Sequence, residues 1–250
     1  MEMDAAGWIV TAIAILITGI SKSGLGGALG GLAVPFMSIW ISPRDAAAVM
    51  LPILIAMDLF GIRAWRGKAD WRDLKVLIPG ALVGIAVGTL SFGVMSDRMV
   101  KGLVGLIALV FALDRLRREK REQHSDQRPS RLFGWLCGAG AGFTSTLAHA
   151  GGPPLMIYQL SWRQPRETFV ATTVFFFAVI NLAKLPFYIG LDLFRPQTLA
   201  MSAMLLPLVP FGVWAGMRLL RHIPERPFYL FAAIALGLSG AKLLWDGIAG

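Results

Sequence analysis

Two short polar segments interrupt apolar stretches of this chain, and their residue types suit the binding of a small anion. Residues 21–31 place Lys22 between two serines ahead of several glycines, and residues 144–152 place three consecutive hydroxyl side chains close to His149. Each segment precedes an apolar stretch that could begin a helix, and a helix N-terminus offers about half a positive charge with unsatisfied N–H groups. The candidate anion-binding residues are therefore Ser21, Lys22, Ser23, Gly24, Gly26, Gly27, Thr144, Ser145, Thr146, His149, Gly151 and Gly152.

Neither segment suits a metal ion or a catalytic reaction. Metal cations require clustered carboxylates, imidazoles or thiolates, whereas the whole chain has three histidines and one cysteine. An enzyme would need a nucleophile beside a base, and the sequence offers no such set. We therefore expect no enzymatic activity, no metal and no cofactor.

Two further polar residues lie within apolar stretches and suggest proton transfer. Asp58 stands in "ILIAMDLFG" and Asn181 in "AVINLAK". A lone carboxylate inside a membrane is costly unless it is protonated or paired, so Asp58 is a candidate for proton coupling. His149 is a second candidate, because a histidine ordinarily titrates near pH 6.5. Asn181 and Lys184 are secondary candidates for the site, although Lys184 lies near the end of its apolar stretch, where we expect an interfacial anchor.

Each of the favoured residues also has a purely structural interpretation. The Lys22 ammonium could reach the outer membrane interface along its flexible side chain. His149 could bond a neighbouring carbonyl and so hold the turn, and the hydroxyls of residues 144–146 could bond carbonyls of their own helix. These alternatives stay open at the level of sequence.

The segments that position these residues are those of a membrane protein. The chain has 250 residues, of which 56% are hydrophobic and 16% charged, a composition too apolar for an ordinary soluble domain. Apolar stretches recur at residues 74–95, 100–113, 169–182, 199–217 and 227–245. A span needs ~20 mostly apolar residues, and runs of this length without strand alternation predict helices. The fold class expected is an all-α polytopic membrane protein.

The net charge of +9 reflects topology rather than nucleic-acid binding. Basic residues gather at 63–75, 115–131 and 218–226, beside apolar stretches. Short basic loops mark the cytoplasmic side of a membrane. The longest basic run, "RLRREKREQHSDQRPSR", lacks the interleaved aromatic residues of a single-strand-binding surface. We therefore place these loops in the cytoplasm and expect no nucleic-acid partner.

Similar patterns in the two halves of the chain predict an inverted repeat. Pro43-Arg44-Asp45 matches Pro165-Arg166-Glu167, and Gly84–Gly88 matches Gly212–Gly216 in the same order. The expected units are residues 1–114 and 132–250, joined by a basic cytoplasmic linker at 115–131. Each unit would hold a broken or re-entrant helical hairpin followed by three transmembrane helices. The two hairpins would enter from opposite sides, so that their glycine-rich tips meet near mid-membrane.

The hairpin segments also resemble a known family. "GISKSGLGGALGGLAVPFMSIWISPRDAAAVMLPILIAMDLFG" and "GFTSTLAHAGGPPLMIYQLSWRQPRETFVATTVFFFAVINLAKLPFY" are similar to the sulfite exporter TauE/SafE family, the sulfite and organosulfonate permeases. The resemblance covers essentially the whole chain. It implies an inner-membrane transporter of sulfur-containing oxyanions, often assumed to be proton-coupled, with eight spans in two four-helix halves.

Residues and resemblance together predict a secondary transporter of the bacterial inner membrane. The expected partners are a small sulfur oxyanion, protons and the lipid bilayer, with a homodimer as an open alternative to a monomer. Two other functions remain in view, an anion channel and a permease for another small organic anion. A channel would use the same positive groups along an open path.

Overall fold

The structure is a computed structural model that describes residues 4–24, 26–27, 33–37, 40–91, 98–99, 102, 105–106, 109, 112–113, 116–117, 127–222 and 224–248. Within these residues the chain is helical and contains no strand, which confirms the all-helical fold class. The helices in chain order are α1 (Ala5–Gly24), α2 (Ala33–Met37), α3 (Pro43–Ala64), α4 (Trp71–Leu90), α6 (Arg131–Ala148), α7 (Gly152–Gln159), α8 (Arg166–Gly190), α9 (Pro196–Leu205), α10 (Leu208–His222) and α11 (Glu225–Ile248).

Several of these helices are long and apolar enough to cross a membrane. Of the residues described, α1, α3, α4 and α8 meet this condition singly, and α9 and α10 meet it together with a bend of 47° between them. The expected span at residues 199–217 is therefore divided between two helices with a bend between them. The bend falls at Pro207, whose ring removes a backbone donor and disfavours a continuous helix. The expected helix at residues 99–116 lies largely outside the described residues.

The first residues of each polar segment continue the preceding helix, which ends within the segment. α1 continues through Lys22 to Gly24, so its 20 residues can cross a bilayer by length and composition. The expectation of a half-helix too short to cross is therefore wrong for α1. Similarly, α6 continues through residues 144–146, because the hydroxyls of Thr144 and Thr146 donate to carbonyls four residues earlier, at 2.8 and 2.9 Å, without breaking the helix.

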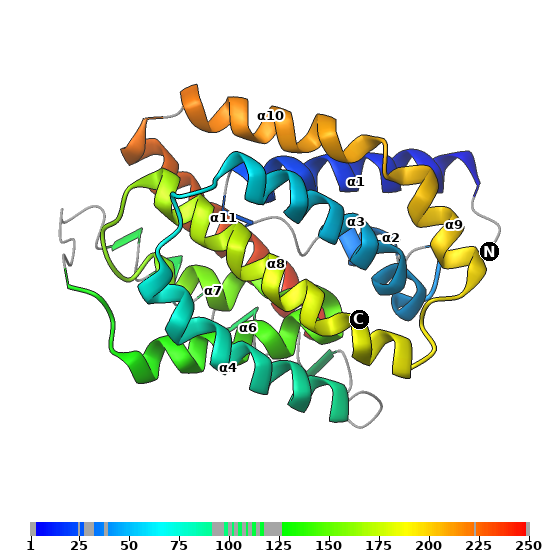
Figure 1. The fold of residues 1–250 in the computed structure, drawn as a ribbon, viewed down its shortest axis with the longest axis horizontal. Coiled ribbons are helices and arrows are strands. Elements are labelled where there is room, and N and C mark those ends of the chain that lie inside the picture. The colour runs from blue at the N-terminus through cyan, green and yellow to red at the C-terminus, as the bar shows by residue number, and fades with distance from the viewer. Residues whose placement is uncertain are drawn as a thin grey trace.

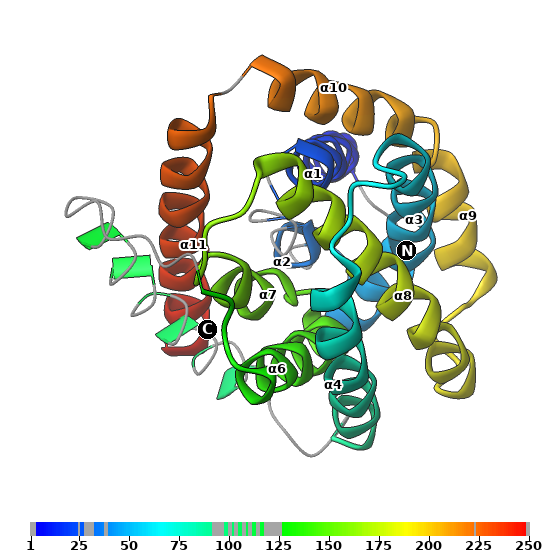
Figure 2. The same ribbon diagram turned by 60° about the vertical axis from the view of Figure 1, so that its left-hand side comes forward.

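The chain reverses after α1 and after α6 in a left-handed backbone conformation. Gly26 and Gly27 have φ angles of 65° and 75°, and His149 has a φ of 51°. Such angles suit glycine and are strained for most other residues. The short helices α2 and α7 follow these turns, and both lie near the middle of the bundle in Figure 2.

Glycine faces allow two helix pairs to pack with their backbones in contact. A Cβ on Gly84 of α4 would lie 2.0 Å from the Ala139 oxygen of α6, and one on Gly24 of α1 would lie 2.1 Å from the Gly216 oxygen of α10. In both pairs the contacting residue numbers rise together, so each pair runs parallel. α3 and α8 lie between the two pairs in both views (Figures 1 and 2), and α8 contacts α3 and α4.

Candidate anion-binding site

The two polar segments meet at one small buried cavity. The cavity measures about 30 Å³, which is room for one or two water molecules. Its walls come from α1, α3, α6, α7, α8 and the turns after α1 and α6, through Thr18, Lys22, Gly27, Leu54, Ser145, His149, Gly152, Phe177 and Asn181. A Cβ on Gly152 would lie 2.9 Å from the Gly27 oxygen, so the two hairpin tips touch. Residues about 120 positions apart in sequence therefore share one site.

Lys22 forms a buried ion pair on one side of this cavity. Its Nζ lies 2.7 Å from Oδ1 of Asp58 and donates to the Leu54 oxygen at 3.4 Å. The amide of Asn181 donates to the other oxygen, Oδ2, of Asp58 at 2.7 Å. Lys22 is 4% exposed, so its ammonium remains inside the protein rather than reaching the membrane interface. Asp58 is accordingly a paired carboxylate that links α1, α3 and α8.

Lys184 lies just behind the opposite wall. It is 0% exposed, and its Nζ donates to the carbonyl oxygen of Ser145 at 3.2 Å and to the hydroxyl of the same residue at 2.9 Å. The same Nζ lies 3.0 Å from Nδ1 of His149. The expected interfacial anchor is therefore wrong, because α8 directs the Lys184 ammonium into the protein, against Ser145 and His149. In the described part of the chain, no carboxylate lies within 4.0 Å of this ammonium.

His149 both holds the turn and lines the cavity. Its backbone N–H donates to the Ser145 oxygen at 3.1 Å and closes α6. Its Nε2 lies 3.0 Å from the carbonyl oxygen of Ala47, which can only accept, so Nε2 carries a hydrogen. Nδ1 then faces the Lys184 ammonium. The expected bond from His149 to a neighbouring carbonyl is thus present. A role of His149 in anion or proton binding stays a prediction.

The remaining candidates surround the cavity without lining it. The Thr146 hydroxyl bonds within α6, as the structural alternative expected, and the Thr144 hydroxyl bonds both α6 and the Ala150 carbonyl of the turn that follows. Only Ser145 of these three residues faces the cavity. Gly24 packs against α10, and a Cβ on Gly26 would lie 2.3 Å from the Phe169 ring. Ser21, Ser23 and Gly151 are also buried beside the two turns. These residues shape the hairpin tips and leave Lys22, Gly27, Ser145, His149 and Gly152 as the lining candidates.

The α7 N-terminus supplies fewer backbone donors than its position suggests. The residues that follow Gly152 are Pro153 and Pro154, which have no N–H group. The α1–α2 turn is described at Gly26 and Gly27, and residues 28–32 lie outside the described part. Polar side chains, rather than helix N-termini, therefore make up most of the described polar surface of this site.

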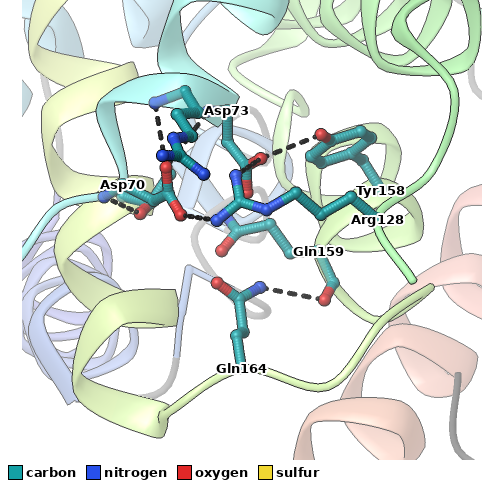
Figure 3. Close-up of polar contacts among 8 residues, drawn as sticks. Asp70, Asp73, Arg128, Tyr158, Gln159 and Gln164 are labelled. Carbon is teal, nitrogen blue, oxygen red and sulfur yellow. Dashed lines mark hydrogen bonds and ion pairs between the residues drawn. The ribbon is translucent and has the colours of Figure 1, made fainter. Parts of the chain in front are cut away.

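A second polar cluster, which our sequence analysis did not find, joins the two halves of the chain at the basic loops. The Arg128 guanidinium bonds Asp70 and Asp73 (Figure 3). It also lies over the Trp162 ring, 4.5 Å from its centroid. The Tyr158 hydroxyl donates to Oδ1 of Asp73 at 3.0 Å. From the sequence, Asp70, Asp73 and Arg128 are assigned only to cytoplasmic loops. The available signal was Asp70 directly before an apolar helix, the position of an N-cap.

The charges of this cluster affect Asp70 most clearly. Burial by itself would raise the pKa of Asp70, but hydrogen bonds from Arg128 and from the Arg72 backbone N–H hold that pKa below its ordinary value. Asp70 also caps α4 by accepting from the N–H groups of Arg72 and Asp73. The cluster thus fixes the start of α4 to the segment that enters α6.

Apolar helices of spanning length around a buried, charged cavity are those of a multi-pass membrane protein. Comparison with known proteins agrees, since the family described as Sulfite exporter TauE/SafE matches residues 11–243. The chain belongs to this family, as the resemblance implied. This chain is 29% identical over 209 residues to the "Probable inner membrane transporter protein TsaS" of Comamonas testosteroni. The matched region covers 81% of this chain and 84% of that protein. No solved structure matches the chain. The protein is thus a multi-pass transporter of the inner membrane.

Proposed function

We propose that this protein is a proton-coupled secondary transporter of small sulfur-containing oxyanions, such as sulfite or organosulfonates, and that the anion binds between the two hairpin tips. The observation that carries the proposal is the Lys184 ammonium, which is fully buried with only neutral partners among the described residues. An uncompensated buried charge costs several kcal/mol. An oxyanion in the adjacent cavity would offset this cost.

The residues facing the cavity support an oxyanion as its occupant. Lys22 and the Ser145 hydroxyl line it, and both can donate hydrogen bonds. Its small volume favours ions of few heavy atoms unless the walls move apart. The family description, sulfite exporter, supports sulfur as the central atom of the substrate.

The helix packing supports an inverted repeat as the basis of alternating access. In the proposed repeat, α1 is equivalent to α6 and α4 to α10. The two glycine-mediated contacts, α4 with α6 and α1 with α10, then become equivalent to each other, with Gly84 matching Gly212 and Gly88 matching Gly216. Exchanged contacts of this kind are what a two-fold axis in the membrane plane would generate. Rocking of one half against the other would open the central site to each side in turn.

The contact between Lys184 and His149 supports proton coupling. A proton on this pair raises the affinity for an anion, and by linkage a bound anion raises the affinity for the proton by the same factor. His149 is therefore the proposed coupling residue. Asp58, which is paired with Lys22, is the second proton carrier we propose to test.

Flux measurements in proteoliposomes test this function. With the purified protein, sulfite or methanesulfonate flux should saturate and should follow an imposed pH gradient. Lys184→Met should lose flux and bind the anion about 10- to 100-fold more weakly, equivalent to ~1.4–2.7 kcal/mol, because it removes the buried positive charge that the anion offsets. Lys242→Met is the matched control, because Lys242 is exposed and pairs with Asp246 at the end of α11.

Two results would contradict the proposal. Flux that never saturates and ignores the pH gradient would indicate a channel. The absence of binding and flux for every sulfur oxyanion, in a protein that remains folded, would assign the site to another ligand.

A further inference from the structure

We infer that the central site is built for a monovalent oxyanion, and that Asp58 sets this preference by cancelling the charge of Lys22. The inference rests on the proposed function and specifies the charge of its substrate. Hydrogensulfite and organosulfonates are monovalent, whereas fully deprotonated sulfite and sulfate are divalent. The preferred valence of the anion depends on how much positive charge the buried side chains leave uncompensated.

The first pair, Lys22 with Asp58, is neutral. Both oxygens of Asp58 face donors, since Oδ1 lies 2.7 Å from the Lys22 ammonium and Oδ2 accepts from the Asn181 amide at 2.7 Å. In this ion pair the negative charge of the carboxylate cancels the positive charge of the ammonium. Lys22 therefore lines the cavity as a donor without adding net charge to it.

The second pair, Lys184 with His149, holds one positive charge. Nε2 of His149 carries a hydrogen because it faces the Ala47 carbonyl, and the 3.0 Å contact between Nδ1 and Nζ needs one further hydrogen between them. Lys184 also donates to the carbonyl and the hydroxyl of Ser145. While this pair holds its coupling proton, its charge is plus one whether the shared hydrogen belongs to the amine or to the ring.

Among the described residues, the cavity is thus left with a single uncompensated positive charge. A monovalent anion makes the assembly neutral, whereas a divalent anion leaves one buried negative charge without a partner. Because uncompensated charge is costly in a low-dielectric interior, the site should discriminate by valence as well as by shape. Asp58 controls this balance from a position that does not line the cavity.

Two tetrahedral sulfur anions of different valence test the inference. Calorimetric titration of the full-length protein in detergent, at one pH and matched ionic strength, would compare methanesulfonate with sulfate. The wild type should prefer methanesulfonate. Asp58→Asn leaves Lys22 uncompensated and should shift the affinity ratio toward sulfate by about tenfold or more, equivalent to ~1.4 kcal/mol.

Matched variants separate charge from local damage. The double variant Lys22→Met/Asp58→Asn restores a charge of plus one and should return the ratio toward the wild-type value. Asp246→Asn removes a carboxylate from an ion pair on α11 and should leave the ratio unchanged. Asn181→Asp adds a negative charge at the Asp58 side and should weaken methanesulfonate binding about tenfold, so the inference stays testable if Asp58→Asn does not fold.

The outcomes distinguish failure of the valence inference from failure of the proposed function. If the wild type prefers sulfate, or if folded Asp58→Asn keeps the wild-type ratio within about twofold, the valence inference is overturned while an anion site remains. If Asp58→Asn does not fold, unchanged methanesulfonate affinity in Asn181→Asp overturns it equally. If the wild type binds neither anion and also fails to bind sulfite, the proposed function itself is overturned.

Discussion

Removal of Lys22 should expose the cost of the carboxylate that it neutralises. In Lys22→Met, Asp58 keeps the Asn181 hydrogen bond but loses its counter-charge at 2.7 Å, and both members of the ion pair are almost wholly buried. Breaking one side of a buried pair costs ~3–5 kcal/mol. Uptake of a proton by the lone carboxyl limits the loss, since neutralising a group that titrates near pH 3.9 costs about 4 kcal/mol at pH 7. We therefore expect a loss of about 3–4 kcal/mol.

Equilibrium unfolding in mixed detergent and SDS micelles measures this loss. The double variant Lys22→Met/Asp58→Asn has no buried charge at this position, and it should regain most of the stability lost in the single variant. The loss in Lys22→Met should also shrink as the pH falls, by up to about 1.4 kcal/mol per pH unit, because protonation then costs less. Lys242→Met, which breaks an exposed pair, should change stability by less than about 1 kcal/mol.

Equal stability of Lys22→Met and Lys242→Met would refute the predicted cost of the unpaired Asp58 carboxylate. The prediction fails equally if the double variant is no more stable than the single variant, because the loss would then come from packing of the lysine side chain. A loss that does not vary between pH 5 and pH 8 would show that the Asp58 charge is not its cause.

Three further predictions concern other parts of the molecule. Gly84→Val should abolish stable folding, since a Cβ there would lie 2.0 Å from the Ala139 oxygen, whereas Gly190→Ala has nothing within 4 Å and should be neutral when both are compared by size-exclusion yield. Arg128→Gln should destabilise the protein by ~1 kcal/mol at neutral pH, and the difference should decline as the pH falls below about 4. The sign follows from the lowered pKa of Asp70, because stability from such a group is present above its unfolded pKa and lost as the pH falls through its folded pKa. Finally, anion affinity measured from pH 5.5 to 8.5 should fall with rising pH in the wild type and much less in His149→Gln; coinciding profiles would make His149 purely structural.

The location of the polar cavity could be predicted from the sequence because burying a charge in a membrane is costly. A lysine within an apolar stretch is therefore rare and indicates a buried polar site. Lys22 and His149 lie in apolar surroundings where each polar group must find a partner, and both line the cavity. The glycines beside them indicated tight reversals, and Gly26 and Gly27 adopt the positive φ angles that such turns require. What these residues bind stays a prediction, since their contacts alone do not identify a ligand.

Helix ends were harder to predict because tertiary contacts decide them. Its place near the end of an apolar stretch predicts an interfacial Lys184, yet the ammonium is buried against Ser145. α1 looked short because Lys22 interrupts its hydropathy pattern. Only the partner carboxylate, 36 positions away in sequence, allows a helix to bury that lysine, and no local pattern reveals such a pairing.

In the proposed inverted repeat, Asp58 and Asn181 occupy corresponding positions but differ in charge. The two residues occupy similar places in α3 and α8, and in the structure they bond each other where these helices pack. A carboxylate at both positions would place two negative charges in contact, and an amide at both would leave Lys22 uncompensated. One of each neutralises Lys22 and leaves the charge of the Lys184–His149 pair to the cavity. In the proposed inverted repeat, backbone symmetry would therefore serve the alternation of access, while the substitution of Asn for Asp at one position would supply the net charge that retains an anion.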